Sequence, residues 1–283
     1  MTVLELIETG ERQLTQAGVV FGHGTHNAFD EAAWLVLWQL GLPLDSVLDG
    51  PDSVASQHPT ATQQTQIAAL FAERIRTRKP AAYLTREAWL QGVAFYVDER
   101  AIVPRSLIAE LLADGAIDSW LSTATQEVLD LCTGNGSLAV LAALAYPDVR
   151  VDACDISADA LAVARINVDK HGLQQRIHLF ESDGLASVRG PYDLILCNPP
   201  YVNALSMAAL PLEYRAEPAL ALSGAATAWT SSAPCCATRR GTWRNRPCWC
   251  LRSAMNASIL KQPSPRSKRS GWKPAPATTR CCC

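Results

Sequence analysis

The residues with the most evident chemistry are Asn198-Pro-Pro-Tyr201, which directly follow the apolar stretch 192–197. Because Pro199 and Pro200 lack backbone donors and fix φ, the predicted strand must stop here in a rigid turn. The Asn198 amide offers one acceptor oxygen and two donor hydrogens and stays uncharged at ordinary pH. With the Pro199 carbonyl as a second acceptor and the Tyr201 ring closing one side, this turn can hold a neutral NH2 group. The alternative for the tetrapeptide alone is an ordinary turn after a strand.

A second set of candidate residues is the glycine turn Thr133-Gly-Asn-Gly136, which follows the strand predicted over 128–132. Gly134 and Gly136 let a ligand lie against the backbone, with Thr133 and Asn135 beside it. Asp155 stands 19 residues after Gly136, a spacing at which a carboxylate reaches ribose hydroxyls. This spacing alone fits a nicotinamide cofactor as well as S-adenosylmethionine.

Two features of the glycine turn favour S-adenosylmethionine. The turn lacks the third glycine that allows close helix packing against a pyrophosphate. Asp130 places a carboxylate beside the turn, which suits the amino group of the methyl donor and would repel a diphosphate. Asp183, at the tip of the next predicted strand, is placed to accept from an adenine amino group. The alternative is that these are ordinary tight turns whose acidic residues only cap helices. The positions of these residues at successive strand tips disfavour it.

The elements that must position these residues alternate along the chain. Strands are predicted at 128–132, 151–155, 177–180 and 192–197, with helices at 137–146 and 158–171 between the first three. This alternation predicts an α/β fold with a parallel, doubly wound, Rossmann-like sheet. Ligands bind such sheets at the carboxyl ends of the strands, where all the candidate residues lie.

A small helical module of about 80 residues is predicted to precede the sheet. Apolar spacing predicts helices over 3–16, from Asp30 as N-cap to Gly41, and around 67–75. His23 and His26 lie three apart in a loop, but no carboxylate or Cys at a familiar ligand spacing accompanies them, so no metal is expected.

A hairpin of short strands, 88–90 and 94–97, is predicted to link the helical module to the sheet. Pro104-Arg105-Ser106 then opens a helix that begins at Leu107. Arg105 and Glu110 are candidates for orienting a substrate, with a solvated pair between them as the alternative. The predicted domains are a helical substrate-recognition domain (1–80), a hairpin linker (81–106), the sheet domain (107–225) and a tail (226–283).

Charge divides the chain sharply. Residues 1–225 carry 27 acidic and 14 basic side chains, net −13, whereas 226–283 carry 11 basic and no acidic ones, net +11. The acidic part makes a poor surface for a nucleic-acid backbone. No apolar run approaches the ~20 residues of a membrane helix, and the N-terminus does not read as a basic signal peptide. We therefore expect a soluble, cytoplasmic protein with reduced thiols and no membrane partner.

Taken together, these residues resemble the HemK/Prm family of protein glutamine N5-methyltransferases, whose mark is a donor-binding glycine turn followed by Asn-Pro-Pro-Tyr. The resemblance covers residues 21–224. Within the family it is greatest to members that methylate a glutamine of large-subunit ribosomal protein three. It rests on Gly22-His-Gly-Thr-His-Asn27, Asp30-Glu-Ala32, Tyr96-Val-Asp-Glu-Arg100, Val103-Pro-Arg-Ser106, Leu129-Asp-Leu-Cys-Thr-Gly134, Asp155-Ile-Ser157, Asn198-Pro-Pro-Tyr-Val202 and Leu212-Glu-Tyr-Arg-Ala-Glu-Pro218.

The resemblance implies a role for each part of the chain. Thr133, Gly134 and Gly136 would contact the methionine part of S-adenosylmethionine, with its ribose on Asp155 and its adenine by Asp183. Asn198 and Pro199 would grip the glutamine amide of the ribosomal protein, which the helical module would recognise.

The sequence is also compatible with three other functions. A release-factor glutamine methyltransferase differs only in its N-terminal motifs. An adenine-N6 DNA methyltransferase shares the Asn-Pro-Pro-Tyr sequence and holds a flipped base by the same amide chemistry. A binding module would keep the donor pocket without activity and act through the basic tail.

The tail 226–283 does not continue the pattern of the fold. It holds seven of the ten cysteines and four of the eight tryptophans, without hydrophobic periodicity and without a Cys-x2-Cys pair for zinc. A nucleic-acid-binding arm is one interpretation of its charge. We favour translation out of frame, because TGC codons for Cys shifted by one base become CTG for Leu or GCT for Ala. The C-terminal strands would then be missing, strand 192–197 would keep an uncovered edge, and the activity of this chain would be weak.

Overall fold

The computed structural model describes residues 1–50, 52–224 and 249–252 of the 283-residue chain. The described residues form two compact units. Unit 1 consists of residues 1–90, 94–105 and 210–217, and unit 2 of residues 91–93, 106–209 and the described residues from 218 onward. The segment 210–217 thus belongs with the N-terminal helices although it follows the Asn198 turn in the sequence.

Unit 1 is built on three helices, α1 (Val3–Gln16), α2 (Ala28–Leu40) and α3 (Ala61–Thr77), which confirm the predicted helical module. Their apolar faces meet in one core that includes the fully buried Ile7, Leu14 and Leu35. The predicted N-cap of α2 was wrong. The Asn27 side chain accepts from the Asp30 N–H at 2.8 Å, so Asp30 lies in the first turn, where the helix dipole favours a carboxylate.

After the three helices the chain forms a short helix and a hairpin. The one-turn helix α4 (Ala81–Thr85) begins after Pro80 and was not predicted. Strands β1 (Glu87–Leu90) and β2 (Val93–Tyr96) pair as expected. Gln91 and Gly92 between them both have positive φ, 51° and 73°, as a two-residue hairpin turn that matches strand twist requires.

Unit 2 contains a five-stranded parallel sheet, which confirms the predicted α/β class. The spatial order is β5-β4-β3-β6-β7. Its strands are β3 (Glu127–Leu131), β4 (Arg150–Asp155), β5 (Ile177–Glu181), β6 (Leu194–Cys197) and β7 (Trp249–Arg252). The chain builds outward from β3 through β4 to β5 and then crosses to β6 on the other side of β3. The switch point of the sheet therefore lies between β3 and β6, where open α/β sheets bind ligands.

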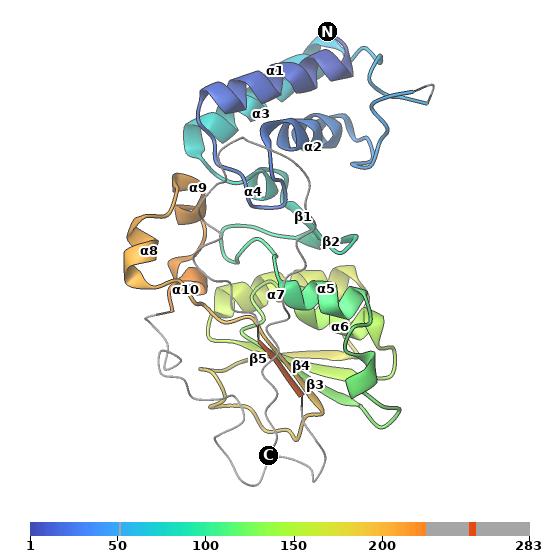
Figure 1. Ribbon diagram of the computed structural model, residues 1–283, viewed down its shortest axis with the longest axis vertical. Helices are drawn as coiled ribbons and strands as arrows, with labels where there is room; N and C mark the ends of the chain where they lie inside the picture. The colour runs from blue at the N-terminus through green and yellow to red at the C-terminus, as the bar shows by residue number, and fades with distance from the viewer. Residues whose placement is uncertain (51, 225–248, 253–283) are drawn as a thin grey trace, which may run out of the picture. The chain divides into compact units, whose positions relative to one another are not determined.

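Helices cover one face of this sheet, with α6 (Ser137–Ala145) against β3 and β4, and α7 (Ala158–Lys170) against β4 and β5 (Figure 1). Helix α5 (Leu107–Ala113) packs on α6, and a short 3-10 helix, η1 (Asp118–Trp120), follows it. Helices on both faces, as a doubly wound sheet has, are not found in the described part of the chain. The β5–β6 connection forms no helix; its Leu185 and Val188 pack instead against the buried cluster that includes Leu129 of β3.

The expectation that β6 would have an uncovered edge was wrong. Strand β7 pairs with β6 in parallel, with Leu194 opposite Trp249 and Cys197 opposite Arg252. Strand pairing uses backbone groups, so it depends weakly on which side chains the segment carries. Apart from β7, the predicted tail lies outside the described residues.

Three short helices follow the Asn198 turn: α8 (Ala204–Ala208), α9 (Leu212–Arg215) and α10 (Ala219–Leu222). An isolated bridge joins Val202, before them, to Ser223, after them. Among the described residues, no helix has both the length and the apolar character needed to cross a membrane.

Candidate active site

The glycine turn after β3 is tightly wound. Cys132, Gly134 and Gly136 all have positive φ, at 60°, 57° and 80°. The Thr133 N–H donates to the Cys154 carbonyl at 2.9 Å, which ties the turn to β4. A Cβ added to Gly136 would lie 3.1 Å from the Ala164 Cβ, so the close approach of this turn to α7 requires a glycine.

Asp130, near the end of β3, is fully buried below this turn. Its Oδ2 accepts from the Thr133 hydroxyl at 2.5 Å and from the Ala139 N–H in the first turn of α6 at 3.0 Å. Burial disfavours the ionised carboxylate and raises its pKa to about 7. Its Oδ1 has no hydrogen-bond partner among the described residues.

Asp155, at the end of β4, holds the glycine turn from the side. Its Oδ2 accepts from the Gly134 N–H at 2.9 Å, and its Oδ1 accepts from the Ser157 N–H at 3.0 Å. Burial raises the pKa of Asp155, although backbone N–H groups oppose the shift. A carboxylate has about four lone-pair sites, so the bonds from backbone N–H groups leave room for a ribose hydroxyl.

The Asn198 turn lies next to the glycine turn across the switch point. Leu131 of β3 is opposite Cys197 of β6 in the sheet register, so Asn198 follows β6 at the level where the glycine turn leaves β3. Asn198 is half-buried, Pro199 is buried and Tyr201 is 38% exposed. The two motifs that the sequence singled out are therefore brought together at one edge of the sheet.

Asp183 lies in the turn after β5, at the outer edge of the described sheet. Its side chain is exposed, and its carbonyl accepts from the Ala186 N–H at 3.1 Å. Asp155 is opposite Glu181 in the register, so Asp183 lies two residues beyond the level of Asp155. Its role beside an adenine stays a prediction.

The residues around the glycine turn fit S-adenosylmethionine. Two buried polar atoms there, Asp130 Oδ1 and Asn135 Nδ2, have no hydrogen-bond partner in the described part of the chain. Leaving such atoms unpaired is costly. An ammonium group suits the Asp130 carboxylate, and a carboxylate suits the Asn135 amide hydrogens. The methionine part of the donor carries both groups.

Arg105, the predicted substrate-orienting residue, belongs to unit 1. The alternative pairing with Glu110 is not what the structure shows. The guanidinium donates instead to both carboxylate oxygens of Glu217, at 2.7 and 2.6 Å. Contact of Arg105 with a substrate stays a prediction.

Two features of this region were not predicted from the sequence. No role was expected for Glu213 and Glu217, whose carboxylates are buried in unit 1. The left-handed conformation of Cys132 was not expected either. The signal for the glutamates was the sequence Leu212–Pro218, quoted above without a function. No local signal marks a non-glycine residue of positive φ at position 132.

Comparison with known proteins identifies the family. The family model "Methyltransferase small domain" matches residues 111–225. The ribosomal protein uL3 glutamine methyltransferase of Burkholderia pseudomallei is 49% identical over 241 residues, covering 80% of this chain and 75% of the relative. The protein of that name from Bordetella pertussis is 48% identical over 228 residues, with the same coverage. A solved SAM-dependent methyltransferase from Agrobacterium tumefaciens has a TM-score of 0.33 and 25% identity over 40% of this chain and 39% of its own.

The sequence identity to the uL3 enzymes spans most of both chains. The two predicted motifs, the glycine turn and the Asn198 turn, lie together at the switch point. The chain belongs to the family of ribosomal protein uL3 glutamine methyltransferases.

Proposed function

We propose that this chain transfers a methyl group from S-adenosylmethionine to the side-chain amide nitrogen (N5) of a glutamine in ribosomal protein uL3. The observation that carries the proposal is the placement of the Asn198 turn beside the glycine turn, across the β3–β6 switch point. One turn is suited to a neutral amide and the other to the methyl donor. The names of the relatives support the choice of protein substrate.

The Asn198 turn would receive the glutamine side chain. Asn198 Oδ1 and the Pro199 carbonyl oxygen accept hydrogen bonds from the amide NH2, and Tyr201 covers one side of it. These bonds place the nitrogen and increase its electron density without a carboxylate base. As the bond from the nitrogen to the methyl carbon forms, the bond from that carbon to sulfur would break, and its electron pair would stay on sulfur as a neutral thioether. The nitrogen would release one proton to solvent. Asn198 stays neutral throughout, so the turn acts chiefly by positioning.

The glycine turn and the neighbouring strand ends would hold the methyl donor, whose sulfonium supplies an electrophilic methyl group. Thr133, Gly134 and Gly136 would line its methionine part, and Asp130 would face its amino group. Asp155 would accept from the ribose hydroxyls. Asp183 would accept from the adenine amino group.

The remaining assignments concern the partner. The helical module, residues 1–80, would recognise uL3, and Arg105 would help to orient it. A ribosomal protein substrate supports a cytoplasmic location for the reaction. The thiols of Cys132 and Cys154, which form no disulfide, suit a reducing compartment.

We also propose that residues 226–283 are translated out of frame. The family model ends its match at residue 225. This match ends where the charge changes from net −13 over residues 1–225 to net +11 over residues 226–283. The active-site residues precede this boundary, but the activity of the chain as printed would be weak.

Tritiated methyl transfer tests the function. The chain is offered unassembled uL3, a release factor and adenine-containing DNA, and we expect label on a uL3 glutamine. Asn198→Ala should reduce this transfer by about a hundredfold or more, because the amide loses an oriented acceptor. The same substitution at the exposed Asn203, which caps α8, is the matched control and should have little effect. Label on the release factor or DNA, or full activity of Asn198→Ala, would contradict the proposal.

A further inference from the structure

The chain leaves the Asn198 turn and returns to it. Between Val202 and Ser223 it forms α8, α9 and α10, and its ends are joined where the Val202 N–H donates to the Leu222 carbonyl and the Gly224 N–H to the Val202 carbonyl, both at 2.9 Å. A Cβ added to Gly224 would lie 3.3 Å from the Pro200 oxygen and from the Tyr201 Cα. Both ends of this excursion are thus in contact with the Asn198 turn.

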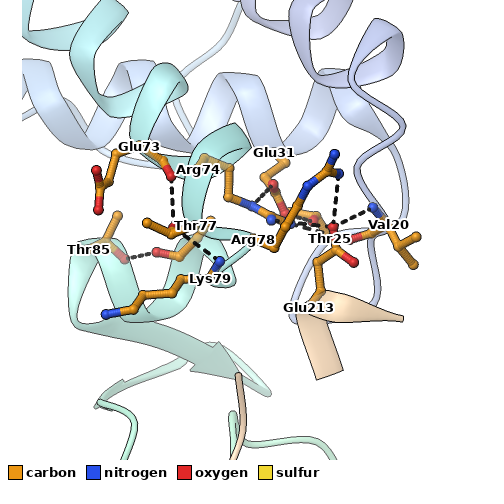
Figure 2. A network of polar contacts seen from close by, with 11 residues as sticks. Val20, Thr25, Glu31, Glu73, Arg74, Thr77, Arg78, Lys79, Thr85 and Glu213 are labelled. Carbon is orange, nitrogen blue, oxygen red and sulfur yellow. Dashed lines mark hydrogen bonds and ion pairs between the residues drawn. The ribbon is translucent and has the colours of Figure 1, made fainter. Parts of the chain in front are cut away.

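The middle of the excursion, residues 210–217, is part of unit 1. We call it the inserted segment. Its Glu213 carboxylate is 2% exposed and lies among groups from the N-terminal helices (Figure 2). Glu213 Oε1 accepts from the Val20 N–H at 3.2 Å and lies 3.4 Å from Arg78 Nη1 and 3.8 Å from Arg74 Nη1.

The two arginines around Glu213 are themselves held in place. The fully buried Arg74 donates through Nε to Glu31 at 2.7 Å and through Nη2 to the Val20 carbonyl at 3.3 Å. Arg78 donates to the Ala17 carbonyl at 2.6 Å. The groups that donate to the Glu213 carboxylate therefore come from residues far from it in the sequence.

Glu217 makes a second set of contacts at the other end of the inserted segment. It accepts from both Nη atoms of Arg105 and, at 3.0 Å, from the Val103 N–H. His23 Nε2 lies 3.4 Å from it. Burial alone would raise the pKa of Glu217, but the charge of Arg105 and contact with His23 outweigh it and lower the pKa to about 2. Glu217 is thus ionised throughout the working range of pH.

Tyr214 lies between the two glutamates in the sequence, and its side chain occupies the space that a side chain at Gly22 would need. Its ring centre is 4.3 Å from that of His23, and Arg105 lies 5.5 Å above the ring. A Cβ at Gly22 would lie 2.5 Å from the Tyr214 hydroxyl. The Gly22–Asn27 loop, which had no function in the sequence analysis, is thus shaped around the inserted segment.

Buried ion pairs are a poor means of adding stability, since desolvation offsets much of their attraction. They do favour a single position of the inserted segment, because a shift of this segment would leave buried charges unpaired. We propose that Glu213 and Glu217 are positioning residues, which hold the inserted segment in unit 1 and thereby keep the Asn198 turn in the conformation that receives the glutamine amide. This inference rests on the proposed function.

The first test uses the full chain with Glu213→Gln and Glu217→Gln combined. We expect kcat for methyl transfer to uL3 to fall about tenfold or more, as the productive turn becomes a minor population. Affinity for S-adenosylmethionine should stay unchanged, because β3 and β4 carry its site. Hydrogen exchange of the backbone amides of residues 201–209 should become faster by a similar factor.

Ile117→Ala is the matched control. Ile117 is fully buried in unit 2 at the start of η1, so its truncation destabilises the protein at a residue outside both the inserted segment and the proposed binding sites. At a temperature where both proteins are folded, this variant should keep the kcat and the exchange rates of the wild type. If the double glutamine variant behaves like Ile117→Ala, the two glutamates are only structural and the proposal is wrong.

A second variant keeps every buried contact but uncouples the segment. Short Gly-Ser linkers are inserted after Ala209 and after Glu217, where the chain passes between the units. We expect unchanged thermal stability with reduced kcat and faster exchange at 201–209; unchanged kcat and exchange would overturn the proposal. If the wild type does not methylate uL3, the proposed function fails, and the exchange rates alone then decide whether the glutamates order the turn.

Discussion

At the scale of single residues, Asp130 is the group whose chemistry depends most on its surroundings. The sequence showed only a carboxylate next to a glycine turn. In the fold it is fully buried, with one oxygen bonded to Thr133 and Ala139 and the other without a partner among the described residues. Burial that raises its pKa to about 7 lets pH decide whether it is charged when the donor arrives.

Donor binding should therefore depend on pH through Asp130. With a pKa near 7 the carboxylate is mostly neutral at pH 5.5 and mostly ionised at pH 7.5. If it holds the donor amino group, affinity for S-adenosylmethionine should rise on the order of tenfold over this range. Titration calorimetry measures this directly.

The control for this prediction is Asp130→Asn, which keeps the shape and removes the charge. Its affinity should be low and nearly constant with pH. A wild-type affinity that does not change between pH 5.5 and 7.5 would show that Asp130 does not hold the amino group.

The raised pKa of Asp130 also has a cost for folding. The unfolded chain binds fewer protons than the folded chain, so this group lowers the free energy of unfolding as pH rises from about 4 to 7.

At the scale of elements, the glycine turn sets the spacing between α7 and the end of β3. Gly136 is both in a left-handed conformation and in contact with Ala164 of α7. The same backbone is predicted to line the donor site. Gly136 is therefore required by the packing against α7, and it is also predicted to line the donor site.

Gly136→Ala should destabilise the protein by about 2 to 4 kcal/mol, from backbone strain and from overpacking against Ala164. Gly172→Ala separates the two causes. Gly172 has a similar φ of +66°, but a Cβ there would meet nothing within 4 Å. Its substitution should cost only about 1 to 2 kcal/mol. Urea denaturation of both variants measures the difference, and equal losses would mean that contact with Ala164 contributes nothing.

At the scale of the whole molecule, the chain combines a family-matched part with a tail of different composition. The match to the family model ends at residue 225, and the charge changes sign there. Strand β7, inside the tail, nevertheless pairs with β6. A parallel partner for β6 is therefore present, whatever the origin of the tail.

Sequencing the gene across codons 220–230 tests the reading frame. We expect an inserted or missing base, and we expect the chain translated from the repaired frame to transfer methyl to uL3 more strongly than the chain as printed. The donor affinity of the two chains provides the control, since β3 and β4 are common to both. A confirmed open frame with full activity would show that the tail is genuine.

Much of the fold was predictable because its signals are local. The first three helices follow from apolar spacing, and four strands of the sheet follow from short apolar stretches that end at glycine, aspartate or Asn-Pro. The resemblance to glutamine methyltransferases, carried by the same motifs, is confirmed by the relatives. The N-cap of α2 was misplaced because Asn27 and Asp30 are both good caps, and only the backbone conformation separates them.

The sequence by itself determined which residues are candidates for the chemistry: the amide of Asn198, the glycines of the turn, and the carboxylates of Asp130 and Asp155. These depend on residue type and on distances of a few residues. Only the tertiary structure decided that β6 lies next to β3, that Arg105 pairs with Glu217 rather than Glu110, and that residues 210–217 belong to unit 1. Such contacts join residues far apart in the sequence, as from Val20 to Glu213, which are 193 positions apart. Their formation depends on burial and on which charges meet in the folded chain. Such contacts cannot be predicted from the pattern of neighbouring residues.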